Sequence, residues 1–384
     1  MSTPALISFF FIFILILYVG VMVYLTLGFY LLKKYDKPMN HIPKTFVSII
    51  IPARNESKNI RACLESVCRQ RYPSDLFEIL IVDDASTDDT AQVVGQYIRE
   101  HTECSIKLIS LPFDKHHAKK YALETGISNS KGELIVTLDA DCTIGNQWLE
   151  SVAFYYEEKK ARMIVMPVQM EAKTSFFSNI QALEFMALIA SSAGSLGWSR
   201  PLMCNGANLA FSREAFDLIG GYSSNHQISS GDDMFLMFNI QKRFGNKAVH
   251  FLKNNAAVAF TEASPTLDAF VHQRLRWTSK SKTYSNSWVI SIAIIVFLMN
   301  LSLLTSWIFF FTSLCSLHVV IIILVSKTLF DFLLLFSFAN YFKQRKPFWT
   351  YIPAVFIIPI YTVLIGLLGN IIPSKWKGRR VSAV

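Results

Sequence analysis

The sequence predicts an α/β protein in which a domain built on a mostly parallel sheet is flanked by transmembrane helices. Three observations support this fold class. Long apolar segments lie near both ends of the 384-residue chain, and short β-rich runs alternate with helical runs between them. The composition also departs from that of an ordinary soluble domain. Hydrophobic residues make up 52% of the chain and charged residues 17%, against about 45–50% and about 25%.

Composition and short motifs argue against several classes of protein. The net charge of +9 is spread along the chain instead of forming one patch, which suits an anionic membrane surface better than nucleic acid. The sequence contains no P-loop, no GxGxxG fingerprint, no CxxC pair and no HExxH motif. Its six cysteines do not make a disulfide scaffold, and we interpret them as reduced packing residues.

Residues 1–34 are predicted to form an N-terminal transmembrane anchor. Residues 5–32 carry no charge and are long enough to cross a hydrocarbon core of ~30 Å. Lys33 and Lys34 follow at once, so the positive-inside rule places the next domain in the cytoplasm. A cleaved signal peptide is the alternative, but neither a basic n-region nor a small-residue cleavage site is present. We expect an integral membrane protein, with a bacterial inner membrane as the first candidate.

The second apolar block, residues 288–372, is predicted to supply two or three membrane segments. Its pieces are 288–310, 317–340 and 348–372. Basic clusters flank these pieces, and three spans would leave the basic tail at 373–384 outside the cytoplasm. We therefore expect 348–372 to be re-entrant or interfacial, because Pro353 and Pro359 should break it early.

Two charged residues, Lys327 and Asp331, lie within the second of these pieces. They are four residues apart and share one helix face. One interpretation is a self-neutralising pair that makes burial tolerable. The other is a functional polar contact at membrane depth.

Residues 45–287 form a block that is large enough for its own core. Its β-rich runs are 46–51, 78–82, 105–110 and 133–138, and its helical runs are 59–68, 87–100 and 118–126. Ser86 is the predicted N-cap of the second helix. This alternation indicates a mostly parallel sheet covered on both faces. Segments 174–192 and 265–283 mix apolar and polar residues at helical spacing, and they are either interfacial helices or domain core.

Two pairs of carboxylates directly follow predicted strands: Asp83 with Asp84, and Asp139 with Asp141. Ligands of open α/β sheets bind beyond the carboxyl ends of the strands, so both pairs should face one crevice. Alternate residues of an extended segment point the same way, so Asp139 and Asp141 can converge on one hard cation. Mg²⁺ or Mn²⁺ takes oxygen ligands and is usually shared with substrate phosphates, so one of these ions is the expected cofactor.

These motifs occur in an order that resembles the family 2 glycosyltransferases of the GT-A fold, which is Rossmann-like with a mostly parallel sheet. The resemblance covers residues 46–277 and is strongest to the membrane-embedded branch that holds cellulose, chitin, hyaluronan and poly-N-acetylglucosamine synthases and ceramide glucosyltransferase. The motifs are IPARNE at 51–56, VDDASTD at 82–88, Lys119 ahead of AL at 122–123, LDAD at 138–141, GDD at 231–233 and QRLRW at 273–277. The last of these, QxxRW, is the most specific.

The resemblance implies a nucleotide-sugar donor and a cytoplasmic catalytic domain. Asp83 and Asp84 would bind the nucleoside, while Asp139 and Asp141 would hold the nucleotide and the metal on the diphosphate. Arg276 and the metal would neutralise the departing diphosphate. The other donor residues that the resemblance implies are Pro52, Arg54, Glu56, Lys119, Gln273 and Arg274.

The resemblance also implies inversion by direct displacement, which needs one base on the acceptor side. Asp233 takes the family's base position, and Asp232 would support it. Trp277 would stack on the acceptor, and a role as an interfacial anchor is its alternative. The remaining acceptor residues that the resemblance implies are Asn205 and Gly206, beside that site, and His226, in a loop that could gate it.

The expected acceptor is a membrane lipid or lipid-linked glycan that receives one sugar. One alternative is a processive β-glycan synthase, which would need an oligomer or accessory subunit to complete a channel. The other is a non-catalytic membrane protein that binds a nucleotide-sugar. Ala118, Glu124 and the GDD at 231–233 depart from the commoner Gly, Asn and Thr-Glu-Asp of the family. These departures leave the mechanism intact and leave the donor and acceptor open.

Overall fold

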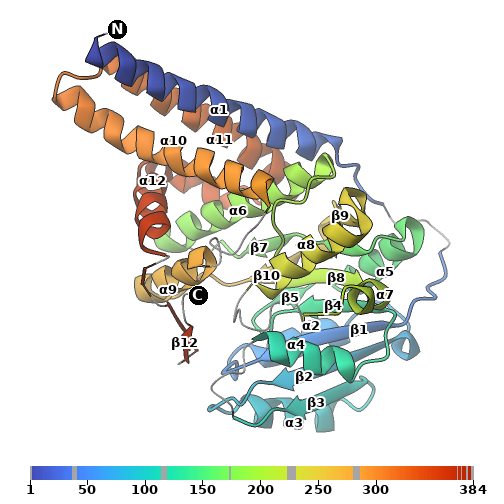
Figure 1. Cartoon of the computed structure of the whole chain (residues 1–384). Helices are drawn as coiled ribbons and strands as arrows, with labels where there is room; N and C mark the ends of the chain where they lie inside the picture. Colours follow the sequence, from blue (N-terminus) through green and yellow to red (C-terminus); the bar gives the residue numbers. More distant parts are fainter. Residues whose placement is uncertain are drawn as a thin grey trace.

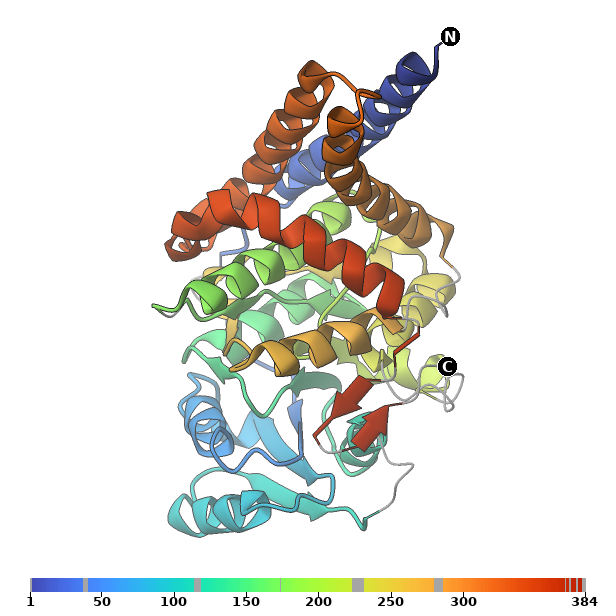
Figure 2. The ribbon, with the colours of Figure 1, turned by 90° about the vertical axis from the view of Figure 1, so that its left-hand side faces the viewer.

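The protein consists of an α/β domain and a bundle of long apolar helices that extends away from it (Figure 1). The computed structural model describes residues 2–36, 41–113, 119–172, 174–222, 231–279, 286–369, 371–372, 374–377 and 379–381. The N-terminus lies at the far end of the bundle, whereas the C-terminal strands lie against the α/β domain (Figure 2).

A seven-stranded sheet with the order β3-β2-β1-β4-β8-β6-β9 forms the centre of the α/β domain. Its strands are Ile106–Ser110 (β3), Phe77–Asp83 (β2), Val47–Ala53 (β1), Leu134–Leu138 (β4), Asn208–Ser212 (β8), Met163–Val165 (β6) and Val249–Phe251 (β9). Strands β3, β2, β1 and β4 run parallel, and β8 runs antiparallel to both β4 and β6. The sheet is therefore mostly parallel, as predicted, and the parallel strands end at one common edge.

The helices predicted in the first half of this domain are present as α2 (Ile60–Cys68), α3 (Thr90–Glu100) and α4 (Lys119–Ser128). The predicted N-cap of α3 is wrong. This helix begins after Asp89, and the Ser86 side chain instead accepts a hydrogen bond from the Asn55 N–H at 2.9 Å and donates to Asp83. An N-cap hydroxyl accepts from the first N–H groups of its helix, and at Ser86 the Asn55 N–H takes their place.

Three further helices complete the α/β domain: α5 (Trp148–Lys159), α7 (Arg213–Leu218) and α8 (Asp232–Phe244). A small second sheet has the order β5-β10-β7 and consists of Thr143–Ile144, Ala259–Thr261 and Val168–Met170. The C-terminal hairpin pairs β11 (Ser374–Trp376) with β12 (Arg379–Val381). This hairpin returns the end of the chain to the α/β domain.

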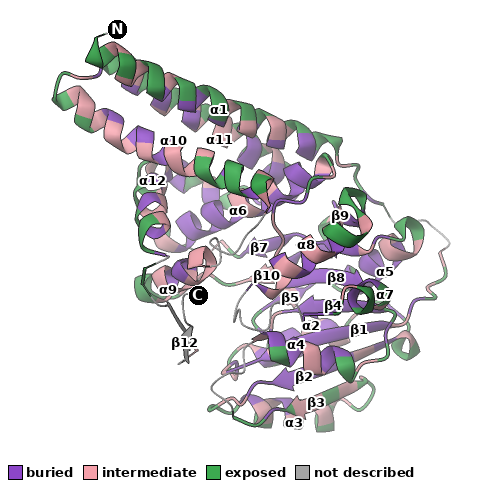
Figure 3. Ribbon diagram, viewed as in Figure 1, coloured by how far each residue is buried: buried purple, intermediate pink, exposed green. Residues whose placement is uncertain are grey.

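Five of the described helices are long and apolar enough to cross a membrane. They are α1 (Thr3–Leu31), α6 (Phe176–Gly197), α10 (Ser287–Phe311), α11 (Leu317–Tyr341) and the segment Lys346–Leu368, which contains the helix α12 (Tyr351–Leu368). Exposed residues run along α1 and gather in the first turns of α10, whereas strands β1, β2, β4 and β8 are mostly buried (Figure 3). Many exposed side chains of α1 are large and apolar, as a surface in contact with lipid requires.

Helix α12 lies across the lower end of the bundle, against α6 and α9 (Leu267–Thr278) (Figure 2). The expectation that its prolines break it is wrong, because the helix continues through Pro359. Pro353 lies in the first turn, where a backbone N–H has no partner within the helix. Pro359 removes one hydrogen bond, and apolar helices in membranes tolerate such a loss when neighbouring groups compensate.

Helix α6 is mostly buried, which supports the domain-core interpretation of this segment. It packs closely against α1 through glycines. A Cβ atom added to Gly28 would lie 1.9 Å from the Gly194 carbonyl oxygen, and one added to Gly197 would lie 1.8 Å from the Gly28 carbonyl oxygen. Only glycine allows this approach, which is the small-residue packing that membrane helices use. Helix α6 thus joins the bundle to the α/β domain.

Candidate functional site

A single cavity of about 1820 Å³ joins the carboxyl ends of the strands to the membrane helices. We call its two parts the polar end, which includes Arg54, Asp84, Asp139 and Asp233, and the apolar end. The apolar end is lined by Met22 and Leu25 of α1, Phe297 of α10 and Ile358 of α12. Pockets for small molecules occupy about 300–1,000 Å³. This cavity has room for a larger, partly apolar ligand.

The first acidic pair follows β2, beside the end of β1. The backbone N–H of Asp84 donates to the Ala53 carbonyl at 2.8 Å, which fixes the turn between the two strands. The Asp83 carboxylate accepts hydrogen bonds from the hydroxyl and the backbone N–H of Ser86, the latter at 3.3 Å. Asp84 lines the cavity together with Pro52. The structure therefore gives Asp83 a role in holding the loop and brings Asp84 to the cavity wall.

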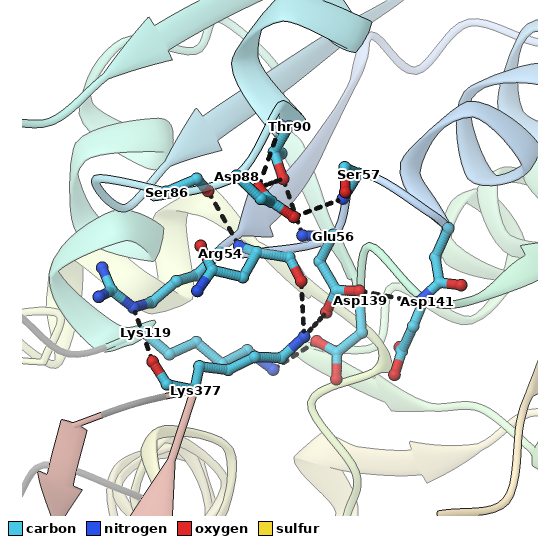
Figure 4. A network of polar contacts seen from close by, with 12 residues as sticks. Arg54, Glu56, Ser57, Ser86, Asp88, Thr90, Lys119, Asp139, Asp141 and Lys377 are labelled. Atoms are coloured by element: carbon cyan, nitrogen blue, oxygen red, sulfur yellow. Dashed lines mark hydrogen bonds and ion pairs between the residues drawn. The ribbon is translucent and has the colours of Figure 1, made fainter. Parts of the chain in front are cut away.

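Arg54 and Glu56 follow β1 and line the same wall (Figure 4). Arg54 donates to the carbonyl oxygens of Asp84 and, at 2.9 Å, of Ala85, so its guanidinium braces the turn after β2. Glu56 accepts from the Asn59 side chain at 2.9 Å and from Lys377 at 2.7 Å. The Lys377 contact comes from the C-terminal hairpin and was not predicted from the sequence.

The second acidic pair follows β4. Lys119, at the start of α4, forms an ion pair with Asp139 (Figure 4). Burial alone would lower the pKa of Lys119, but Asp139, Asp232 and Asp233 outweigh it and raise this pKa. Burial, with Asp139 and Glu56 nearby, raises the pKa of Asp141 to about 7. Negative charge is thus concentrated where the sequence predicted a cation.

This acidic end suits a shared Mg²⁺ or Mn²⁺ better than a metal held by protein alone. Within the described ranges, no group of three or more His, Cys, Asp or Glu side chains could hold a metal ion. Mg²⁺ usually takes one or two carboxylates and completes its shell with water and substrate phosphates. Asp139 and Asp141 both line the cavity, and the pKa of Asp141 is raised by burial and by the like charges of Asp139 and Glu56, which a cation would offset. Their chemistry therefore fits such an ion.

The candidate base, Asp233, lies in the first turn of α8, after Gly231 with φ of 94°. Its Oδ2 accepts a hydrogen bond from the Gly206 N–H at 3.0 Å, and its Oδ1 accepts one from the Met234 N–H at 2.8 Å. Gly206 belongs to the turn that leads into β8, next to β4. Asp232, Asp233, Asn205 and Gly206 all line the cavity. The structure therefore brings these predicted residues together at one wall.

The QxxRW residues lie on α9, and the two arginines have different surroundings. Arg274 is buried and pairs with Glu184 of α6, with 3.1 Å between Nε and Oε2. Gln273 accepts from Arg274 at 2.5 Å and from the Ser264 hydroxyl at 3.3 Å. Burial lowers the pKa of Arg276, whereas Asp139, Asp232 and Asp233 oppose this shift. Arg276 therefore faces the acidic end, and Arg274 joins two helices.

Trp277 lines the cavity and packs on protein groups as well. Its ring centroid is 6.1 Å from that of Phe185 and 4.2 Å from the Arg274 guanidinium carbon. His226 lies outside the described residues. Lys327 and Asp331 form the predicted pair, with 2.6 Å between Nζ and Oδ2, and both line the cavity. The hydroxyl of Tyr18 also donates to Asp331.

Three functional candidates were missed from the sequence. Glu184 accepts from Arg274, and the Tyr361 hydroxyl donates to Glu184 at 2.6 Å, but the two residues lie on helices far apart in the chain. Lys377 was assigned only to a basic tail. A Lys-Gly pair between two short runs indicates a turn, although no local pattern tells where such a hairpin docks.

The chain was compared with known proteins. The model of the family "Glycosyl transferase family 2" matches residues 48–220. The probable glycosyltransferase YdaM of Bacillus subtilis is 28% identical over 256 residues, which make up 64% of this chain and 57% of that protein. The beta-monoglucosyldiacylglycerol synthase of Nostoc is 27% identical over 252 residues, which make up 63% of this chain and 50% of that protein. The chain thus spans about half the length of these relatives.

The mannosyltransferase PcManGT of Pyrobaculum calidifontis, solved in complex with GDP-Man and Mn²⁺, matches nearly the whole chain. The TM-score is 0.57 at 18% sequence identity, and the match covers 94% of this chain and 99% of that chain. The similarity shows a shared fold.

The mostly parallel sheet has acidic strand ends, and together with these matches it defines a glycosyltransferase domain of the GT-A fold. Residues 48–220 are a domain of glycosyltransferase family 2.

Proposed function

We propose that this protein is an inverting glycosyltransferase that moves a sugar from a nucleotide-sugar to a membrane lipid or a lipid-linked glycan. A UDP-sugar is the first candidate for the donor. The observation that carries the proposal is the single cavity of about 1820 Å³. It continues from the carboxylates at the strand ends to the apolar side chains of α1, α10 and α12. An acceptor with a polar head and an apolar chain fits both ends at once.

The donor binds at the polar end. Asp84 faces the nucleoside, and Arg54 and Asp83 hold the loops around it. Asp139 and Asp141 would hold the Mg²⁺ or Mn²⁺, which would supply Lewis-acid stabilisation of the leaving group. Arg276 and Lys119 add positive charge beside these carboxylates, and a guanidinium fork suits phosphate oxygens. The placement of Lys119 and Arg276 is supported because Asp139, Asp232 and Asp233 act on the pKa of both.

The acceptor hydroxyl attacks the anomeric carbon of the donor sugar from the side opposite the diphosphate. Asp233 takes the proton of this hydroxyl as the new carbon–oxygen bond forms. The bond between the anomeric carbon and the diphosphate oxygen breaks, and its electron pair leaves with the nucleoside diphosphate. The Gly206 N–H holds one oxygen of Asp233, so the carboxylate is positioned before the acceptor arrives.

We further propose that α1, α10 and α11 cross the membrane, with the α/β domain in the cytoplasm, and that α12 does not cross. Lys33 and Lys34 follow α1, and Lys343 and Arg345 follow α11. By the positive-inside rule these ends are cytoplasmic. The Gln344 side chain donates to the Met170 carbonyl at 3.0 Å, and Lys377 reaches Glu56. Both ends of α12 therefore lead to the α/β domain.

A lipid acceptor is supported in two ways. The Nostoc relative is named for a synthase of a glycolipid. The Lys327–Asp331 pair lines the cavity among the membrane helices, where it offers hydrogen bonds to the polar part of an acceptor.

A donor screen on the purified protein in lipid tests the proposal. Each radiolabelled UDP- or GDP-sugar is offered with Mg²⁺ or Mn²⁺ and a total lipid extract, and the products are separated by size. We expect label in a small product that organic solvent extracts. Label in a long lipid-free polymer would identify a processive synthase instead. Nucleotide binding without any transfer would support a non-catalytic binding protein, and no nucleotide binding would contradict the proposal altogether.

A further inference from the structure

We propose that Lys377, in the turn of the C-terminal hairpin, binds the diphosphate of the donor and so completes the donor site from the end of the chain. This inference rests on the proposed function, because it requires a nucleoside diphosphate donor. Family 2 motifs end at α9, and Lys377 lies about a hundred residues beyond them. Its side chain enters the acidic end of the cavity (Figure 4).

The contacts of Lys377 lie on the loop that follows β1. Its ammonium group is 2.7 Å from Glu56 Oε1 and donates to the Asn55 carbonyl at 3.1 Å. Its own carbonyl accepts a hydrogen bond from Arg54 Nε at 3.5 Å. Lys377 thus attaches the hairpin to both the backbone and the side chains of the loop that follows β1.

The charges around Lys377 are those of the donor site. Glu56 is the ion-pair partner of Lys377. The positive charge of Lys377 also lowers the pKa of Asp141, against the larger effect of burial. A diphosphate that arrives with a divalent cation brings negative charge to the same place. The Lys377 side chain is 31% exposed, so its flexible stem can turn from Glu56 to a phosphate oxygen. A lysine binds phosphate as a compact point charge and needs no fixed orientation.

The path of the chain places the hairpin between two parts of the site. Helix α12 ends at Leu368, and β11 begins at Ser374 beside α9, the helix that carries Arg276. The turn then brings Lys377 to Glu56, on the opposite wall. Lys377 has a positive φ of 47°, a conformation that non-glycine residues rarely adopt. The contacts with the donor loop hold the turn in this form.

The competing interpretation is a plug, in which Lys377 occupies the donor site and must leave before the donor binds. The two interpretations predict opposite changes in the affinity for the nucleoside diphosphate when the charge of Lys377 is removed. If Lys377 binds the diphosphate, removing its charge weakens binding of the nucleoside diphosphate. If it is a plug, removing its charge strengthens this binding.

The test uses the full-length protein in lipid nanodiscs with Mn²⁺. We would measure the Kd for UDP, GDP and the matching nucleosides by calorimetry, and the donor KM for the sugar that is transferred. Lys377→Met removes the charge and Lys377→Arg keeps it. Lys346→Met removes another exposed lysine near the C-terminus, outside the cavity. Thermal unfolding checks that each variant is folded.

We expect Lys377→Met to raise the Kd for the nucleoside diphosphate and the donor KM at least about tenfold. The Kd for the nucleoside should stay within about twofold, and Lys377→Arg and Lys346→Met should stay close to the parent. An unchanged or lower diphosphate Kd in Lys377→Met would overturn the inference while the proposed function stands. A parent protein that binds no nucleoside diphosphate would overturn both.

Discussion

The Lys253 side chain caps the end of the first membrane helix at Phe29. Its ammonium group donates to the Phe29 carbonyl at 2.8 Å and to the Leu32 carbonyl at 3.1 Å. It also lies 4.0 Å from the centre of the Phe29 ring. Lys253 follows β9, so one side chain joins the sheet of the catalytic domain to α1. The last carbonyls of a helix have no partner within the helix, and a cation is favoured there.

Replacing Lys253 should loosen this junction. Lys253→Met leaves two carbonyls without their donor, and we expect the protein to lose about 1–3 kcal/mol of stability. Thermal unfolding in detergent measures the loss. Lys242→Met is the control, because Lys242 is exposed on α8. Equal melting temperatures for both variants would contradict the capping role.

The same junction should depend on pH. Burial lowers the pKa of Lys253 to about 8, whereas a lysine in the unfolded chain titrates near 10.4. Between these values the unfolded state binds more protons, so this contribution to stability rises with pH. Wild-type protein should therefore gain stability relative to Lys253→Met between pH 8 and pH 10. A difference that stays constant or narrows over this range would show that the lysine is not desolvated.

The contact between α1 and α6 should be sensitive to one methyl group. Gly28→Ala places a Cβ 1.9 Å from the Gly194 carbonyl oxygen, so the helices must separate. We expect a cost of about 1–3 kcal/mol from overpacking. Gly20→Ala, on the same helix, meets nothing within 4 Å, so it should be neutral or slightly stabilising. Thermal unfolding of the two variants in one detergent gives the comparison, and similar melting temperatures would argue against close packing here.

Asp233→Asn should separate donor binding from transfer. The amide oxygen of Asn can still accept the hydrogen bond from the Gly206 N–H, so the turn keeps its form. The variant cannot take a proton, and we expect the transfer rate to fall about 10²–10⁴-fold while the Kd for the nucleoside diphosphate stays similar. Asp217→Asn, on the exposed side of α7, is the control. Transfer at the parental rate in Asp233→Asn would mean that another group is the base.

Local sequence patterns were sufficient to predict the part of the site that lies at the strand ends. Asp84 and Asp139 follow β2 and β4 directly, so the alternation of strands and helices was enough to place them at one edge. The predicted N-cap of α3 was wrong because the Ser86 hydroxyl accepts from a competing donor, the Asn55 N–H in the loop after β1. Lys377 could not be placed from the sequence, since its contacts with Asn55 and Glu56 depend on the path of the whole chain.

The two arginines of α9 show a second limit of sequence reasoning. Residues two apart are about 200° apart around the helix axis, so Arg274 and Arg276 leave α9 on different sides. The motif does not tell which of them pairs with another helix. Buried Glu184, on another helix, decides the matter by pairing with Arg274.

Because Arg274 and Arg276 have different surroundings, replacing them should have different effects. Arg274→Met leaves Glu184 as an uncompensated buried charge and should cost about 3–5 kcal/mol of stability. The double variant Arg274→Met with Glu184→Gln should recover part of this loss. Arg276→Met should fold normally, because Arg276 faces the acidic end, and its transfer rate should fall about 10²–10³-fold through lost charge stabilisation. Melting temperatures and steady-state kinetics of the three variants distinguish the roles. If Arg274→Met kept its melting temperature and raised the donor KM, Arg274 would be the phosphate ligand.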